Sequence, residues 1–159
     1  MDELLKLLKR NALETPENLA RMLDMPVDEV KAKIEHYEQA GIIRGYQAVV
    51  NHDQLDLNMV TAVIEVKVTP EREGGFNHIA DRISRFEEVQ SLYLMSGAFD
   101  LLLFVSGRTL KEVAFFVSDK LATIPGVLST ATHFMLKTYK DHGVLMESQD
   151  EYERLKVSP

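Results

Sequence analysis

The sequence contains no cysteine and no tryptophan, and it has only five prolines and eight glycines among 159 residues. The absence of cysteine excludes disulfides, thiolate catalysis and cysteine-ligated zinc, and it fits a reducing compartment. No run of 18 apolar residues occurs, and Met1-Asp2-Glu3 is not the basic start of a secretion signal. We therefore expect a cytoplasmic protein with no membrane partner.

The chain also lacks an excess of positive charge. Eighteen Lys and Arg stand against 25 Asp and Glu, a net charge of −7, and residues 1–50 carry seven basic and nine acidic side chains. The overall field therefore argues against a general affinity for nucleic acid. Any DNA binding must come from a local arrangement of cations on one face.

Patterns of catalytic or metal-binding residues are missing as well. No Gly-rich phosphate loop is present, and the serines lack a base at motif spacing. The histidines are scattered without ligand-like spacing, at His36, His52, His78, His133 and His142. We expect no metal site, no cofactor and no enzymatic activity.

What the first fifty residues do contain is a helical pattern. Thr15-Pro16 is a good helix start, and Gly41 stands where a left-handed cap ends a helix. Leucines at 4, 5, 7 and 8 predict a first short helix, and apolar residues at Val30, Ile34 and Tyr37 predict a third from about 27 to 40. A strand over residues 42–50 follows. This is the outline of a (winged) helix-turn-helix domain with a linker strand, in residues 1–50.

A polar, turn-prone segment, residues 51–58, predicts a linker between domains. Alternation over residues 59–68 predicts a strand, and further strands are expected over 89–95, 101–105 and 127–139. Amphipathic helices are expected after Gly75 and after the capping box Thr109–Glu112. The order βαββαβ predicts a ferredoxin-like domain in residues 59–140, with a four-stranded antiparallel sheet and an overall α+β fold. Residues 141–159 are expected to be a polar tail with a short helix over 149–155.

The turn between the second and third strands stands out. Residues 101–105 are all apolar, which predicts a strand buried on both faces, and Asp100 lies just inside it. One interpretation is a turn aspartate that accepts nearby backbone N–H groups. The other is a polar group that holds a small ligand at the edge of the sheet.

Two helices on one side of this sheet leave its other face open. The strands are rich in Leu, Val, Phe and Met, so we expect an apolar face too large for a soluble monomer to expose. Pairing with a second copy, sheet against sheet, is the simplest way to bury it. Coverage by the tail is the alternative, although the tail is polar.

Both halves of the chain resemble one family, the leucine-responsive regulatory protein (Lrp)/AsnC, or feast/famine, family of transcription factors. The residues that carry the resemblance in the first half are Leu19, Ala20, Val30, Lys33, Ile34, Tyr37, Glu38, Gly41, Ile42, Ile43, Gly45 and Tyr46. In the second half they are the hairpin over residues 94–103, Leu121, Pro125, Gly126, Val127, Thr130, Thr132 and Lys140. The resemblance implies a regulator that binds double-stranded DNA, forms homodimers and often rings of four dimers, and binds a free amino acid between dimers.

Within the helix-turn-helix, four side chains are the candidates for DNA contacts: Lys31, Lys33, His36 and Arg44. The family usually opens its recognition helix with Ser and carries Arg one turn later, but this chain has Pro26, Asp28 and Glu29, and Lys33 replaces Arg. Carboxylates repel phosphates, and lysine lacks the fork that pairs with guanine. The alternative is therefore a ligand-binding and oligomerisation module with a degenerate helix-turn-helix that acts through protein partners.

The effector-binding residues that the resemblance implies come from the hairpin, the second helix and the last strand. They are Leu94, Met95, Ser96, Gly97, Ala98, Asp100, Leu110, Thr132, Phe134 and Met135. The backbone N–H groups of Gly97 and Ala98 would bind the carboxylate of an amino acid, and Asp100 would accept from its ammonium group. The alternative for each apolar member is ordinary packing in a core or an interface.

Overall fold

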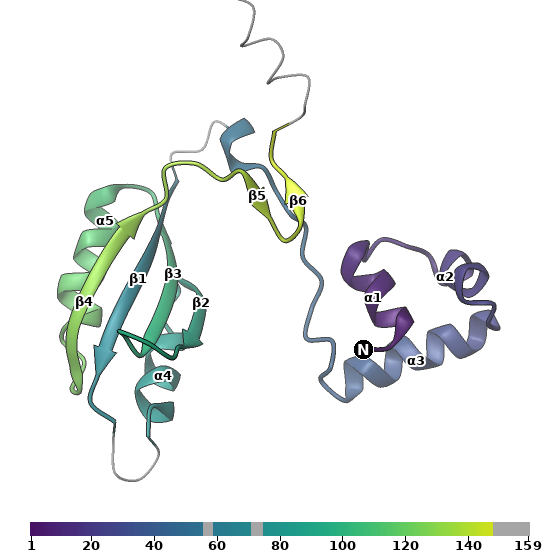
Figure 1. The fold of residues 1–159 in the computed structure, drawn as a ribbon, viewed down its shortest axis with the longest axis horizontal. Coiled ribbons are helices and arrows are strands. Elements are labelled where there is room, and N and C mark those ends of the chain that lie inside the picture. Colours follow the sequence, from purple (N-terminus) through teal and green to yellow (C-terminus); the bar gives the residue numbers. More distant parts are fainter. Residues whose placement is uncertain (56–58, 71–74, 148–159) are drawn as a thin grey trace, which may run out of the picture. The chain divides into compact units, whose positions relative to one another are not determined.

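A computed structural model describes residues 1–55, 59–70 and 75–147, and the chain divides into two compact units, residues 1–50 and the part from Asn51 onward. The first unit holds three helices, coloured purple to blue in Figure 1. Their bounds are α1 Glu3–Arg10, α2 Pro16–Leu23 and α3 Val27–Gln39. This agrees with the three helices predicted from the apolar pattern.

Caps fix where these helices begin and end. The Asp2 carboxylate accepts from the Leu4 N–H at 2.8 Å, and the Thr15 hydroxyl accepts from the Asn18 N–H at 3.2 Å. Asp24 takes a left-handed conformation (φ 52°) after α2, and Gly41 does so (φ 68°) after α3. Each cap satisfies a backbone group that the helix itself leaves without a partner.

The core of the first unit is small and aliphatic. It consists of Leu4, Leu8, Leu19, Ala20 and Val30, with Ile34 and Tyr37 packed against it. The strand predicted over residues 42–50 is wrong: the chain turns after α3 and continues without regular structure. Residues 44–50 form no backbone hydrogen bond with the other described residues. This segment therefore has no neighbouring strand to pair with, despite its β-branched residues.

The second unit is a four-stranded antiparallel sheet with the order β2-β3-β1-β4. Its sheet strands and helices are β1 Val60–Val68, α4 Asn77–Ser84, β2 Val89–Leu94, β3 Leu101–Gly107, α5 Leu110–Phe115, the π-helix η2 Phe116–Leu121 and β4 Val127–Phe134. A short 3-10 helix, η1 His52–Gln54, precedes them, and a two-residue hairpin follows, β5 Lys140–Asp141 with β6 Val144–Leu145. The predicted α+β, ferredoxin-like fold is confirmed.

One face of the sheet packs against the helices. Side chains alternate along the strands, so Ile64, Val66, Leu101 and Leu103 lie fully buried with Ile83 of α4. Burying each such side chain contributes about 1.5–3 kcal/mol. The prediction that β3 is buried on both faces is wrong, because its alternate residues are only half-buried on the open face.

That open face is less apolar than predicted. The strand register places Val63, Leu102 and Phe104 at its centre, and the rings of Tyr93 and Phe104 meet edge to face at 6.2 Å. Towards β4 the face is polar, since His133 Nε2 lies 3.4 Å from Glu65 Oε1. The strands are rich in Leu and Val mainly because those residues face the helices.

The last strand ends earlier than the predicted Tyr139. Phe134 pairs with Ala62, and the Met135 N–H donates to the Thr61 carbonyl at 2.9 Å. Because β1 begins at Val60, the chain beyond Met135 has no neighbouring strand to pair with. It forms the small β5–β6 hairpin instead, which was not predicted. The helix predicted over 149–155 lies outside the described residues.

Helix α5 begins at the predicted capping box, with one change. The Thr109 hydroxyl accepts from the Glu112 N–H at 3.1 Å, but the Glu112 carboxylate accepts from the Arg108 N–H, one residue before the cap. The apolar pattern of residues 110–121 predicts that Leu110 is buried in the helix core, but this is wrong, because 55% of Leu110 is exposed. Val113, Phe116 and Leu121 provide the buried face of this helix.

Candidate DNA-binding and effector-binding residues

The turn between β2 and β3 exposes most of the candidate effector residues. Leu94 to Ala98 are all exposed, whereas Asp100 is half-buried. Gly97 adopts a φ of 137°, a conformation that side chains with a Cβ rarely take. Within the described residues, the N–H groups of Gly97 and Ala98 donate to no backbone carbonyl.

Asp100 is held by the neighbouring strand. Its Oδ2 accepts from the Val68 N–H at 2.9 Å, and its own N–H donates to the Val66 carbonyl at 3.0 Å. The β1–β4 pairing shifts register between Lys67 and Val68, and the Asp100 carboxylate accepts from the N–H at that irregularity. Asp100 therefore bonds backbone, as the first interpretation expected, although its partner lies 32 residues away rather than in the turn.

Leu110, Phe134 and Met135 form a second group, towards the end of the sheet opposite the turn. Leu101, at the start of the strand after the turn, pairs with Val66, whereas Phe134 pairs with Ala62, four residues back along β1, or about 13 Å. Leu110 follows Gly107, which pairs with Val60, and is exposed together with Met135. Thr132, opposite Ile64, is half-buried between the two groups.

The two groups are also separated across the sheet. The turn joins β2 and β3, whereas Phe134 and Met135 belong to the β4 edge, on the other side of β1. One copy of the described chain therefore does not bring the ten candidates together around one small molecule. A site that uses all of them needs residues from two copies.

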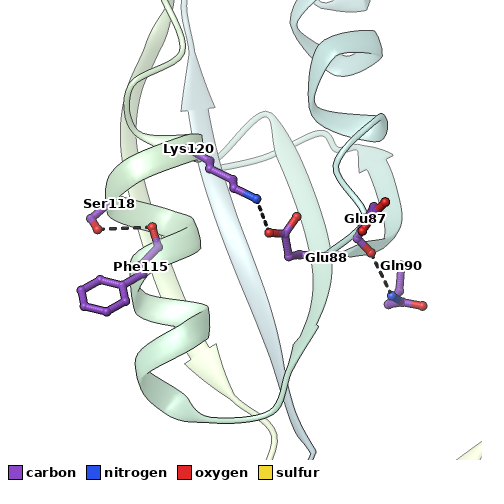
Figure 2. A network of polar contacts seen from close by, with 6 residues as sticks. All are labelled: Glu87, Glu88, Gln90, Phe115, Ser118 and Lys120. Atoms are coloured by element: carbon purple, nitrogen blue, oxygen red, sulfur yellow. Dashed lines mark hydrogen bonds and ion pairs between the residues drawn. The ribbon is translucent and has the colours of Figure 1, made fainter.

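A hollow of about 290 Å³ lies on the helix side and contains none of the ten candidates. Its lining is mixed, with Val105, Val113 and Phe116 beside the carboxylates of Glu88, Glu112 and Asp119. Lys120 forms an ion pair with Glu88, and Figure 2 shows that pair joining η2 to the chain before β2. The hydrogen bond from Lys120 lowers the pKa of the Glu88 carboxyl.

Both lysines of α3 are already paired within the first unit. Lys31 is exposed but lies 3.9 Å from Glu17 of α2, and Lys33 is half-buried, 3.8 Å from Asp2. Pairs of this kind are weak, so DNA phosphates can compete for the lysines.

The other two candidates are exposed. His36 lies on α3 with its ring 6.0 Å from that of Tyr37, and Arg44 follows the helix. The outward side of α3 also carries exposed carboxylates, those of Asp28, Glu29 and Glu35. The local cation arrangement that DNA binding requires is therefore sparse on this helix.

Sequence reasoning missed two polar residues near these candidates. Asp2 combines a cap, the Lys33 pair and a hydrogen bond with Tyr37; the bond from the Leu4 N–H is the main cause of its lowered pKa. Burial, and then the bond to Asp2, raises the pKa of Tyr37. Arg21 lies exposed at the end of α2, where its guanidinium donates to Asn18. An acidic residue just before an apolar helix was the signal available for Asp2.

The described ranges, 1–55, 59–70 and 75–147, contain neither a candidate membrane span nor a candidate metal cluster. No helix there is long and apolar enough to cross a membrane. No three His, Cys, Asp or Glu side chains there gather so that they could hold one metal ion.

Comparison with known proteins agrees with the fold. Residues 61–145 match the family model described as the Lrp/AsnC ligand binding domain. The HTH-type transcriptional regulator YugG of Bacillus subtilis (strain 168) is 46% identical over 158 residues, which cover 99% of this chain and 95% of that protein.

Two solved structures share the fold. A transcriptional regulator of Neisseria meningitidis in complex with L-methionine has a TM-score of 0.70 at 24% identity, covering 89% of this chain and 93% of that one. A feast or famine regulatory protein of M. tuberculosis, also with L-methionine, has a TM-score of 0.70 at 21% identity, covering 87% and 90%. On the family model and the extent of the B. subtilis match, this chain belongs to the Lrp/AsnC family of HTH-type transcriptional regulators.

Proposed function

We propose that this protein is a cytoplasmic, amino-acid-responsive transcription regulator rather than an enzyme. Residues 1–50 bind double-stranded DNA through α3, and a free amino acid binds between dimers. The observation that carries the second part is the placement of the candidate effector residues, which lie at opposite ends and edges of one sheet. A site between two copies would combine the turn between β2 and β3 of one copy with the end of β4 of the other.

The chemistry of the two groups is complementary. The turn offers the N–H groups of Gly97 and Ala98 to a carboxylate, and the second oxygen of Asp100 to an ammonium group. Leu110, Phe134 and Met135 offer an apolar surface to a side chain. The solved relatives with L-methionine support an amino acid with an apolar side chain as the ligand.

Self-association is the second requirement. The open face of the sheet has an apolar centre formed by Val63, Tyr93, Leu102 and Phe104, which a second copy would bury. Dimers then assemble further, up to the family's rings of four. An amino acid that binds between dimers favours one assembly, and that population shift changes which pairs of α3 face the DNA.

Substitution of Asp100 tests the binding site. Asp100→Asn keeps an oxygen for the Val68 N–H but removes the charge that binds an ammonium group. We expect it to keep the wild-type melting temperature and to lose the increase that a binding amino acid causes, measured by a thermal-shift screen of the twenty amino acids. Asp100→Ala also leaves the Val68 N–H without its partner, which costs about 1–3 kcal/mol.

The outcomes separate the two roles of Asp100. If Asp100→Asn responds to the same amino acid as strongly as the wild type, the carboxylate does not bind the ammonium group and the site lies elsewhere. If no amino acid raises the melting temperature of the wild type, the amino-acid response itself is wrong.

One observation favours a second function. The outward side of α3 is acidic, and both of its lysines are paired within the unit. The alternative is therefore a ligand-binding and oligomerisation module whose helix-turn-helix acts through protein partners.

Electrophoretic retardation of the protein's own upstream DNA separates the two. DNA binding predicts a sequence-dependent shift that weakens with salt, since each phosphate contact releases counterions. No shift at low salt, with or without amino acids, supports the protein-partner alternative.

A further inference from the structure

The chain leaves α3 through a fixed turn. The N–H groups of Ile42 and Ile43 both donate to the Tyr37 carbonyl, at 2.9 and 3.0 Å, and Gly41 supplies the left-handed conformation that this return requires. The backbone is therefore fastened to the last turns of α3 as far as Ile43.

The side chain of Tyr46, three residues later, forms a second contact with α3. The Tyr46 hydroxyl donates to Glu38 Oε1 at 2.9 Å, which ties the departing chain back to α3 across eight residues. Burial, and then the bond to Glu38, raises the pKa of Tyr46, so the hydroxyl keeps its proton at neutral pH. Tyr46 is 52% exposed and touches no element of the core. Packing in the core therefore does not account for this aromatic residue.

The next fastened residue belongs to the other unit. Asn51 accepts from the Asp53 N–H at 3.1 Å and donates its side-chain amide to the Met146 carbonyl at 2.7 Å. The residues between, 47–50, are exposed and form no backbone hydrogen bond with the rest of the described chain. From Tyr46 to Asn51 the chain spans at most about 18 Å, whereas from Ile43 it spans up to about 29 Å.

We propose that Tyr46 is a positioning residue: its hydrogen bond to Glu38 shortens the tether, so that a rearrangement of the ligand-binding unit reaches α3. A short tether becomes taut after a small displacement, whereas a slack one absorbs the displacement before it transmits any force. In this proposal the hydroxyl acts through Glu38 and not by contact with DNA or an amino acid. This inference rests on the proposed function, because it supposes that amino-acid binding changes DNA affinity.

Tyr46→Phe removes the hydroxyl and keeps the ring. In the full chain, the dissociation constant for the protein's own upstream DNA is measured with and without an equimolar mixture of the twenty amino acids. We expect the two constants of the wild type to differ by about 5–150-fold, the usual range of allosteric coupling. In Tyr46→Phe the ratio falls close to one, while the constant without amino acids stays at the wild-type value.

Matched variants identify the cause. Glu38→Gln keeps an acceptor for the Tyr46 hydroxyl. Tyr37→Phe removes a tyrosine hydroxyl on α3 itself, the one that bonds Asp2. Both variants should keep the wild-type ratio. Inserting Gly-Ser-Gly after Gln47 lengthens the tether by about 10 Å and should reproduce the loss. Circular dichroism checks that each variant is folded.

The outcomes distinguish a failure of this inference from a failure of the proposed function. An unchanged ratio in Tyr46→Phe overturns this inference and leaves the proposed function standing. A loss in Tyr37→Phe as large as in Tyr46→Phe also overturns it, because the effect would then not depend on the tether. A wild type that binds DNA with the same constant in both conditions contradicts the amino-acid-responsive function and this inference together.

Discussion

Single polar side chains hold the ends of several elements in this protein. Asp2 caps α1 and pairs with Lys33 of α3, and Asp100 bonds β1 from the neighbouring turn. Both carboxylates accept from backbone N–H groups, which are costly to leave without partners. Removal of the oxygen and removal of the charge are therefore different perturbations, and the Asn and Ala variants separate them.

Substitution of Asp2 tests this at one residue. Asp2→Ala removes the cap, and we expect it to lower the free energy of unfolding by about 1 kcal/mol, whereas Asp2→Asn still caps the helix and loses much less. Chemical denaturation followed by circular dichroism measures both. A loss in Asp2→Asn as large as in Asp2→Ala would show that charge, not the cap, dominates.

The pKa of Asp2 adds a pH dependence of known sign. Because folding lowers the pKa of Asp2, the charged carboxylate stabilises the fold at pH values above the pKa of an unfolded aspartate, about 4. This stabilisation is lost as the pH falls from there through the lowered pKa of the folded state. The stability difference between wild type and Asp2→Asn should therefore shrink below about pH 4.

At the scale of the element, the helix from Leu110 to Leu121 changes from α to π at Phe116. Phe116 and Leu121 are five residues apart, and in a regular α-helix they would lie on different faces. The wider turn, with the Ala122 N–H donating to the Val117 carbonyl at 2.8 Å, lets both enter the core. The same turn brings Lys120 to Glu88 and within 5.8 Å of the Phe86 ring centroid.

Lys120→Met tests that contact. Without the hydrogen bond from Lys120, the lowered pKa of Glu88 should rise towards its usual value, which an NMR titration of the carboxyl measures. Since the pair is partly exposed, the free energy of unfolding should change by only about 0–1 kcal/mol. Lys111→Met is the matched control, because that lysine lies over the Phe115 ring and should leave the Glu88 pKa unchanged.

For the whole molecule, the open face of the sheet is the predicted seam between two copies. Phe104→Asp places a charge at its apolar centre, so we expect sedimentation velocity to detect monomers where the wild type forms dimers. Phe115→Asp makes the same change on an exposed residue of α5 and should keep the dimer. Dimers that persist in a folded Phe104→Asp variant would place the seam elsewhere.

Local patterns were sufficient for most of the elements. The caps at Thr15, Gly41 and Thr109, and the alternation along β1, act through near neighbours in the chain, so the sequence predicted them. The strand predicted over 42–50 failed because β-propensity forms no strand without a neighbouring one to pair with. The predicted end of β4 failed for the same reason, since β1 stops first.

By itself the sequence determined the three helices of the first unit, the βαββαβ order of the second and the family resemblance, because caps, periodicity and motifs are encoded over a few residues. Only the tertiary structure decided that Asp100 bonds β1, that Lys33 pairs with Asp2, that Tyr46 bonds Glu38, and that the candidate effector residues lie at opposite ends of one sheet. Those facts depend on strand register and on how helices cross, which join residues far apart in the chain and leave no local pattern.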